Sequence, residues 1–526
     1  VLWVTALAAL ANAALLALVN IAAEQSAAQK PVGAQLTLLY LLAVATYAIA
    51  NGASLRGANA LLQQRLSDLR LRLADRIRRS DLRSVETLGR GQLFAIVAQE
   101  TNHLAQNFPM LVGAAQSLGL VLFCVLYIAW LSLVSFIVIL LAVGAGLLFF
   151  ASRRRQLNAD MVRVHASEAA MLEALTHFAE GFQEIRLNAA RNESLFARFR
   201  AILDDLEREV DRIGRNWVVL LLFSNAFMYA LLGVVVFVLP MFFAGYTDII
   251  YKIAAAALFC VGPVIGVFSV AHVYSRAEIG LVHVLELERQ LALHAPVEDA
   301  DAAPAAFAGF RTITLEDIRF QYVDETGRPG FTTGPWSLQL QRGELLFLRG
   351  GNGNGKSTAL KLLCGLYRPA SGRILVDDVT VEHATLPAYR ELFSAIFTDF
   401  HLFDRLHGLE GQPGERVREL IERMQLTHKV SYTDGRFSTL DLSTGQRKRL
   451  AMIVAQLEDR EIYVFDEWAA DQDSHFRGVF YTELLPDLRA RGKTVVVVTH
   501  DERFWHLGDR LVTLEQGQMT VAPVQG

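Results

Sequence analysis

The hydrophobic positions divide the chain into two unlike halves. Before about residue 290 they form six apolar runs of bilayer length, whereas from about residue 310 short β-branched runs alternate with polar helical segments. At about 1.5 Å per residue, even the shortest run approaches the ~30 Å thickness of the hydrocarbon layer. The pattern predicts six membrane spans, at Leu2–Ala23, Gln35–Leu55, Pro109–Trp130, Leu133–Ala151, Asn216–Phe243 and Ile249–Tyr274.

The distribution of basic residues orients these spans. The loops Arg56–Phe108 and Ser152–Arg215 are rich in arginine, while the loops around Lys30 and Lys252 hold one lysine each. Basic loops stay on the cytoplasmic side, so both ends of the membrane half are predicted to lie in the cytoplasm. The first span lacks the basic lead of a signal peptide, and we expect a cytoplasmic lead-in before it.

The long basic loops show helical periodicity. Between the second and third spans, leucine and isoleucine recur at steps of three and four, which predicts an amphipathic helix continuing the second span for roughly 35–40 Å. This stripe consists of Leu62, Leu66, Leu69, Leu73 and Ile77. We expect the loop tips near Val85–Gly91 and Phe178–Ile185 to contact the second half of the chain, since long ordered stalks need a partner.

A few polar residues interrupt the apolar spans. They either hydrogen-bond between helices or line a cavity for a polar, aromatic or peptide-like cargo, and the sequence leaves both readings open. These residues are Asn12, Tyr47, Asn51, Gln116, Ser224, Asn225, Tyr229 and His272.

The segment Phe347–Pro369 places a glycine-rich loop between an apolar run and a helical pattern. Its residues GGNGNGKST match G-x-x-x-x-G-K-[ST], in which glycines let backbone N–H groups converge on phosphate oxygens. Lys356 would neutralise the β- and γ-phosphates, and the Ser357 hydroxyl would reach Mg²⁺. The residues expected to hold the phosphates are Gly350, Asn352, Gly353, Asn354, Gly355, Lys356, Ser357 and Thr358.

Two later apolar runs end in residues suited to phosphoryl transfer. After EIYVFDE, Asp466 would bind magnesium through water and Glu467 would polarise the attacking water. The run KTVVVVTHD indicates a buried parallel strand ending in His500, which would contact the γ-phosphate from the same sheet edge. Each residue alone would more often be structural, and the phosphate loop in the same chain favours the catalytic interpretation.

The segment DLSTGQRKRLAM, Asp441–Met452, places Ser443, Gly445 and Gln446 where a loop enters a helix, a favourable site for an anion. With this spacing, the chain from Ile313 onward resembles an ATP-binding cassette, and the whole chain resembles a half-size ABC exporter with six spans and one cassette.

The resemblance implies roles for these positions. Tyr322, in IRFQY, would stack on adenine, Glu467 would be the base and His500 the switch histidine. The residues implied to contact the γ-phosphate of ATP bound to the other subunit are Ser443, Gly445 and Gln446.

Four stretches give a narrower resemblance. FTDFHLFDRL, FDEWAADQD, FRGVFYTELLPDLRARGKTVVVVTHDE and EGFQEIRLNAARNE are similar to bacterial exporters of cyclic peptides and siderophore peptides, of the pyoverdine, syringomycin and microcin type. Thr398 stands where most cassettes carry a glutamine that touches Mg²⁺, and Thr398 or Asp399 would substitute for it. The usual S-A-L-D after the base becomes Ala470, Asp471, Gln472 and Asp473.

These patterns predict a multi-domain protein. We expect an all-α six-helix transmembrane domain of the ABC exporter type at residues 1–293, a linker at 294–309, and an α/β P-loop NTPase cassette domain at 310–526. The net charge of −4 gives no field that favours nucleic acid as a partner.

Each chain has one phosphate loop and one copy of the segment Asp441–Met452, which matches the signature segment of ATP-binding cassettes. These cannot complete a site if each ATP lies between Lys356 of one subunit and Ser443 of another, so we expect a homodimer in membrane lipid. The predicted function is ATP- and Mg²⁺-dependent export of a peptide-like substrate across the bacterial cytoplasmic membrane by alternating access. Periplasmic or outer-membrane export partners are consistent with this function. A multidrug or lipid exporter, a siderophore importer, an ATP-gated channel or regulatory module, and a tethered ATPase remain as alternatives.

Overall fold

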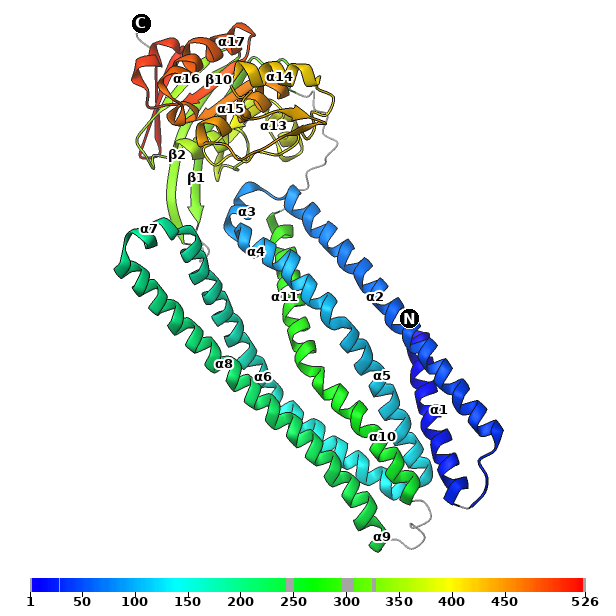
Figure 1. Ribbon diagram of the computed structural model, residues 1–526. Coiled ribbons are helices and arrows are strands. Elements are labelled where there is room, and N and C mark those ends of the chain that lie inside the picture. Colours follow the sequence, from blue (N-terminus) through cyan, green and yellow to red (C-terminus); the bar gives the residue numbers. More distant parts are fainter. Residues whose placement is uncertain (1, 28, 243–249, 295–306, 324–327, 524–526) are drawn as a thin grey trace. The chain divides into compact units, whose positions relative to one another are not determined.

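A computed structural model describes residues 2–27, 29–242, 250–294, 307–323 and 328–523 (Figure 1). The chain forms two compact units: Val1–Arg72 with Phe94–Leu287, and Leu73–Leu93 with Glu288–Gly526. Most of the expected linker, residues 295–306, lies outside the described residues, as do Phe243 and Ile249 at the ends of two expected spans. The domain boundaries at residues 293 and 310 stay predictions.

Among the described residues, the regular secondary structure of the first unit consists of helices alone. Helices α2 and α11 also run into the second unit. The helices are α1 (Leu2–Ala27), α2 (Ala34–Arg79), α5 (Thr101–Leu131), α6 (Leu133–Glu180), α7 (Phe182–Leu187), α8 (Ala189–Gly233), α9 (Leu239–Phe242), α10 (Ile250–Ser269) and α11 (Ala271–His294), with π-helical turns at Ala95–Glu100 and Val234–Val238.

Every predicted span falls on one or more of these helices. Four described helices are long and apolar enough to cross a membrane: Trp3–Ser26, Ala34–Arg79, Ile96–Leu131 and Ala189–Val238. The fourth and sixth predicted spans coincide with shorter apolar stretches, Leu133–Gly146 and Lys252–Val267. The unit therefore has the composition of a multi-pass membrane domain.

The long helices follow from local sequence signals. Helix α2 continues for 46 residues and buries Leu66 and Leu73, which confirms the predicted amphipathic extension of the second span. Ser132 caps α6 by accepting the N–H of Ser135, and the Asn188 side chain caps α8 in the same way. Helices α6 and α8 run side by side for most of their length (Figure 1).

The second unit is built on two main sheets. An antiparallel sheet has the order β2-β1-β4-β5, a six-stranded sheet has the order β12-β11-β3-β10-β9-β6, and β7 and β8 form a hairpin. The strands are β1 (Thr312–Val323), β2 (Pro329–Gln341), β3 (Leu345–Arg349), β4 (Ser371–Val376), β5 (Val379–Thr380), β6 (Phe393–Ile396), β7 (Tyr432–Thr433), β8 (Arg436–Phe437), β9 (Ile462–Asp466), β10 (Thr494–Val498), β11 (Arg510–Glu515) and β12 (Gln518–Pro523).

Strands β3, β10, β9 and β6 are parallel neighbours, so their carboxyl ends meet at one edge. Strands β9 and β10 are buried on both faces, as their unbroken apolar runs predict. Tyr463 and Phe465 pack on the helical side of the sheet, and Ile462 and Val464 pack toward the antiparallel sheet. The helices of this unit are α3 (Leu82–Leu88), α4 (Arg90–Phe94), α12 (Lys356–Leu363), α13 (Leu386–Arg390), α14 (Gly414–Arg423), α15 (Thr444–Glu458), α16 (Ser474–Val479) and α17 (Leu485–Ala490), with short 3-10 and π turns between them.

Helix α3 is docked on the strands and helices of its own unit. Its Glu86 carboxylate accepts hydrogen bonds from Lys361 Nζ at 2.9 Å and from the Tyr367 hydroxyl at 2.5 Å. The Arg83 guanidinium donates to the Val323 carbonyl at 2.7 Å. These contacts confirm the expected role of the loop tip near Val85–Gly91, while contact by Phe178–Ile185 stays a prediction.

Candidate active site

The phosphate loop lies between β3 and α12, as the sequence predicted. Gly353 and Gly355 adopt φ of +79° and +91°, a left-handed region that glycine enters without strain. At Gly350 the restriction is steric, because a Cβ there would lie 2.2 Å from the carbonyl oxygen of Leu514. Asn354 donates to the same carbonyl at 3.2 Å, and Asn352 is exposed. The loop is thus held against β11 by contacts that require its glycines.

Lys356, at the start of α12, is buried and folds back over the loop. Its Nζ donates to the carbonyls of Gly350 at 2.8 Å and Gly351 at 3.2 Å. The same ammonium lies 3.6 Å from Glu467 Oε1 and 3.3 Å from His500 Nε2. A single positive charge therefore connects the phosphate loop with the ends of β9 and β10.

The next residue of the loop, Ser357, is tied to Asp466 at the end of β9. Its hydroxyl donates to Asp466 Oδ2 at 2.7 Å, and Asp466 is only 1% exposed. Burial raises the pKa of this carboxyl and the neighbouring Glu467 charge adds to the rise, whereas the Ser357 hydrogen bond and the charges of Lys356 and Lys448 oppose it. The carboxylate is therefore poorly solvated and available to a cation.

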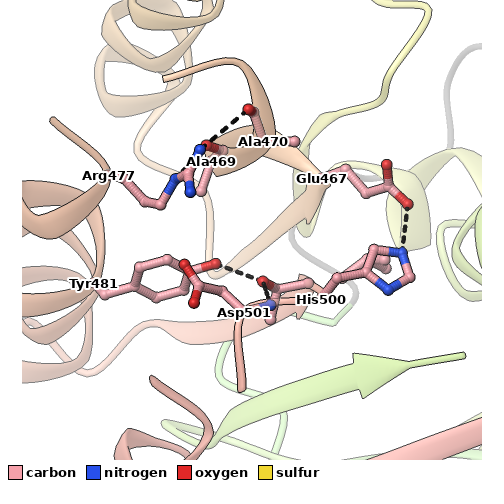
Figure 2. Close-up of a pocket in the computed structure, with 9 residues that line it drawn as sticks. Glu467, Ala469, Ala470, Arg477, Tyr481, His500 and Asp501 are labelled. Atoms are coloured by element: carbon pink, nitrogen blue, oxygen red, sulfur yellow. Dashed lines mark hydrogen bonds and ion pairs between the residues drawn. The ribbon is translucent and has the colours of Figure 1, made fainter. Parts of the chain in front are cut away.

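Glu467 and His500 face each other across the sheet edge. Their nearest atoms, Oε1 and Nε2, are 3.3 Å apart, and Figure 2 shows the two side chains pointing toward one another. Both residues line a hollow of about 350 Å³. The other lining residues are Ala469, Ala470, Arg477, Tyr481, Val498, Thr499 and Asp501.

Tyr322 lies at the side of the phosphate loop helix. Its hydroxyl is 2.9 Å from Thr358 Oγ1, and the Arg83 guanidinium carbon lies 4.9 Å from the centre of its ring. The half-buried ring is thereby held between the loop and helix α3, where it presents an aromatic surface next to the predicted phosphate site.

Two groups of predicted residues make no hydrogen bond or ion pair with this cluster among the described residues. Ser443 caps α15 through a reciprocal pair of hydrogen bonds with Gln446, and Gly445 is in the first turn. Within the described ranges, no hydrogen bond or ion pair joins these three residues to the phosphate loop. Thr398 and Asp399 follow β6 on the same sheet edge as Asp466, and both are exposed.

The oxygen donors present fit a hard cation that also takes ligands from phosphate and water. Ser357 and Asp466 supply a hydroxyl and a carboxylate beside the loop. Among the described residues there is no cluster of three or more histidine, cysteine or acidic side chains able to enclose a metal ion. Mg²⁺ is typically bound by one or two protein oxygens plus substrate phosphates, so this donor set suits it.

Sequence reasoning missed several residues that the structure places at the site. Tyr481 lines the hollow, and its hydroxyl oxygen lies 2.5 Å from Thr499 Oγ1. Lys448, on α15, donates to the backbone carbonyl of Glu467 at 2.7 Å. Nothing in the sequence marks Lys448, because a lysine on a helix is normally solvated.

The fold and the site together define a nucleotide-binding cassette joined to a helical membrane domain, and comparisons with known proteins agree. The family profile described as ABC transporter matches residues 334–470. The ATP-binding protein SyrD of Pseudomonas syringae pv. syringae is 32% identical over 496 residues, which cover 90% of this chain and 86% of SyrD. The chain belongs to the ABC transporter family.

Other relatives match a smaller share of the chain. The macrolide export ATP-binding/permease protein MacB of Vibrio parahaemolyticus is 31% identical over 234 residues, 39% of this chain and 34% of MacB. Among solved structures, a bacterial Atm1-family ABC exporter with ATP bound superimposes with a TM-score of 0.79 at 19% identity, over 98% of this chain and 93% of that one. The fold is therefore that of an ABC exporter, with a multi-pass membrane domain and a cytoplasmic cassette. The protein is an ATPase coupled to transport.

Proposed function

We propose that two copies of this chain form a homodimer that uses ATP to export a peptide-like substrate from the cytoplasm. One observation supports the dimer. Lys356, Glu467 and His500 meet at one sheet edge, whereas Ser443 and Gly445 have no bond to them within the described residues. A second subunit, turned to place its Ser443 over this phosphate loop, would complete each site.

In this proposal the phosphate loop holds ATP, with Tyr322 against the adenine. The closed dimer is favoured because only that state gives ATP both the loop of one subunit and the signature serine of the other. Shifting a two-state population from 1:99 to 99:1 requires about 5.5 kcal/mol of differential binding. Two ATP molecules bound across the dimer are suited to supply it, and dimer closure would then turn the membrane cavity outward.

Hydrolysis would reverse closure by removing the phosphate that bridges the subunits. Glu467 accepts the proton of the attacking water, and His500 holds the γ-phosphate in line with it. Lys356 neutralises charge on the phosphates. Ser357 and Asp466 would hold Mg²⁺, which supplies charge compensation when bound.

The peptide-like cargo is supported by the resemblance of four sequence stretches to exporters of cyclic and siderophore peptides. Polar groups in the membrane helices are compatible with it. Gln116 donates to Ser54 at 3.4 Å, between α5 and α2. The buried Oδ1 of Asn51, on α2, has no hydrogen-bond partner among the described residues. Such a group would accept from a polar cargo.

Two substitutions test the ATP site in the purified full chain. Lys356→Ala should abolish ATP binding, and Glu467→Gln should keep binding but lower turnover by at least about 100-fold, as loss of a general base does. Normal turnover by Glu467→Gln would remove the base assignment while leaving the phosphate loop assignment intact.

The cargo is tested with inside-out membrane vesicles. A cyclic peptide or a siderophore peptide should accumulate in the lumen when ATP is added, and vesicles carrying Glu467→Gln should accumulate none. Uptake of hydrophobic dyes or lipid analogues without any peptide would favour the multidrug or lipid exporter instead. Peptide flow down its gradient in the Glu467→Gln vesicles would indicate a channel.

A further inference from the structure

Lys448 is a charged residue in the interior of the cassette. Its side chain is 3% exposed, and its Nζ donates to the Glu467 carbonyl at 2.7 Å while lying 2.6 Å from Asp471 Oδ2. Burial of an ammonium is costly unless the charge is paired and hydrogen-bonded, and these two acceptors satisfy that need. Lys448 therefore links helix α15, which Ser443 caps, to the segment that follows β9.

The carbonyl that Lys448 holds belongs to a residue with an unusual backbone. Glu467 has φ +52° and ψ +36°, a left-handed conformation in which the Cβ of a residue other than glycine crowds the following carbonyl oxygen. Its N–H donates to the Val498 carbonyl at 3.2 Å. The main chain of Glu467 is thus fastened on one side by β10 and on the other by Lys448, and its direction sets where the carboxylate points.

A second link joins the same two segments. Gln472 is 4% exposed, and its side-chain amide donates to the Gly445 carbonyl at 3.0 Å and accepts from Arg449 Nε at 2.9 Å. Asp471 and Gln472 are two of the positions at which this chain departs from the usual S-A-L-D. The departure therefore creates an ion pair and side-chain hydrogen bonds between α15 and the segment after Glu467, within one subunit.

We propose that Lys448, with Asp471 and Gln472, is a positioning residue that holds the Glu467 carboxylate in its hydrolytic orientation. The inference rests on the proposed role of Glu467 as the base. In the proposed dimer, Glu467 acts on the ATP held by its own subunit, whereas Ser443 and Gly445 contact the ATP of the partner. Lys448 and Gln472 then make the two segments one rigid element, so that a shift of the signature loop moves the base.

The chain contains a matched control for loss of a buried lysine. Lys493 is 8% exposed, and its Nζ donates at 2.9 Å to the carbonyl of Asp459, which has φ +50°. Its Nζ also lies 3.4 Å from the Asp459 carboxylate. Lys493 thus repeats the Lys448 arrangement at the other end of β10 from His500. Removing it measures the structural cost of such an anchor without touching the site.

The experiment compares Lys448→Met with Lys493→Met in the purified full chain, using melting temperature, ATP affinity and ATPase kinetics. Lys448→Met should lower kcat by at least about tenfold while ATP affinity stays within about twofold, since a misplaced catalytic group slows chemistry without weakening binding. Lys493→Met should lower the melting temperature by about as much as Lys448→Met does, and should keep kcat within about twofold of the wild-type value. Wild-type kcat in Lys448→Met, or equal kcat losses in both variants, would overturn the proposal.

A second variant keeps the test decisive if Lys448→Met does not fold. Gln472→Leu approximately preserves side-chain volume and removes both hydrogen bonds of the side-chain amide. It should also lower kcat at unchanged ATP affinity. A wild-type kcat in this variant would overturn the rigid link. Glu467→Gln serves as the reference: if it hydrolyses ATP normally, the proposed base is wrong, whereas a dead Glu467→Gln with fully active Lys448→Met contradicts only the positioning role.

Discussion

The hydroxyl of Ser357 donates to Oδ2 of Asp466 at 2.7 Å, so the first turn of α12 is bonded directly to the end of β9. The two residues are 109 positions apart in the chain, and parallel pairing of β3, β10 and β9 brings them together. A phosphate-binding loop and a cation-binding carboxylate are thereby fixed relative to each other. The bond places a proton donor and a buried charge where a magnesium nucleotide is expected to sit.

The raised pKa of Asp466 predicts a pH dependence of magnesium-assisted ATP binding. Because burial raises this pKa above its ordinary value of 3.8, the carboxyl takes up a proton at a higher pH than an exposed aspartate would. The protonated group is a poor cation ligand. The gain in ATP affinity on adding Mg²⁺ should therefore shrink as the pH falls and this carboxyl takes up its proton. Titrations with and without Mg²⁺ at several pH values measure this gain.

Asp466→Asn provides the control for that pH dependence. The variant should lose about 10- to 100-fold of the Mg²⁺-dependent affinity at neutral pH, because a group that orients the cation and its waters is neutralised. It should also lack the part of the pH dependence that belongs to this carboxyl. An unchanged pH profile in Asp466→Asn would show that another group is responsible.

Gly350 is predicted to tolerate no side chain. In Gly350→Ala the new Cβ would lie 2.2 Å from the Leu514 carbonyl oxygen, so the phosphate loop or β11 must move. We expect ATP affinity to fall by at least about tenfold, because movement of the loop misplaces the groups that position the substrate. Gly478→Ala, on α16 with open space around it, should bind ATP normally. Equal affinities for the two variants would contradict the assigned loop geometry.

The Glu86 contacts predict a link between α3 and transport. Glu86→Lys replaces attraction with repulsion at Lys361, and peptide uptake should fall by about tenfold, because a charge-assisted hydrogen bond contributes about 1.5–3 kcal/mol. Adding Lys361→Glu in the same chain should restore part of the uptake. The control is Arg373→Glu, which places two acidic side chains at the exposed Arg373–Glu316 pair and should leave uptake unchanged. Failure of the double variant to recover would argue against a direct charge contact.

Much of this arrangement could be predicted from the sequence, because it depends on local signals. The order of strand, glycine loop and helix around Lys356 is encoded in consecutive residues, and the apolar runs before Asp466 and His500 place them at the carboxyl ends of buried strands. The same holds for α2, whose leucine stripe predicted that the second span continues beyond the membrane.

Features that depend on tertiary packing could not be predicted. The burial of Lys448 follows from its position between α15 and the segment after β9, and a helix pattern does not reveal such a partner. The left-handed backbone of Glu467 is likewise set by contacts on both sides. The sequence indicated that a loop tip would dock, but the partners of Glu86 lie 275 and 281 positions away.

The central claim is that ATP is hydrolysed only between two copies of this chain. The most direct measurement compares ATPase activity in lipid nanodiscs that hold one copy with activity in nanodiscs that hold two, with copy number counted by mass. We predict turnover in the two-copy nanodiscs alone, and its loss there when Ser443 is replaced by arginine. Equal turnover per chain in one-copy nanodiscs would contradict the account.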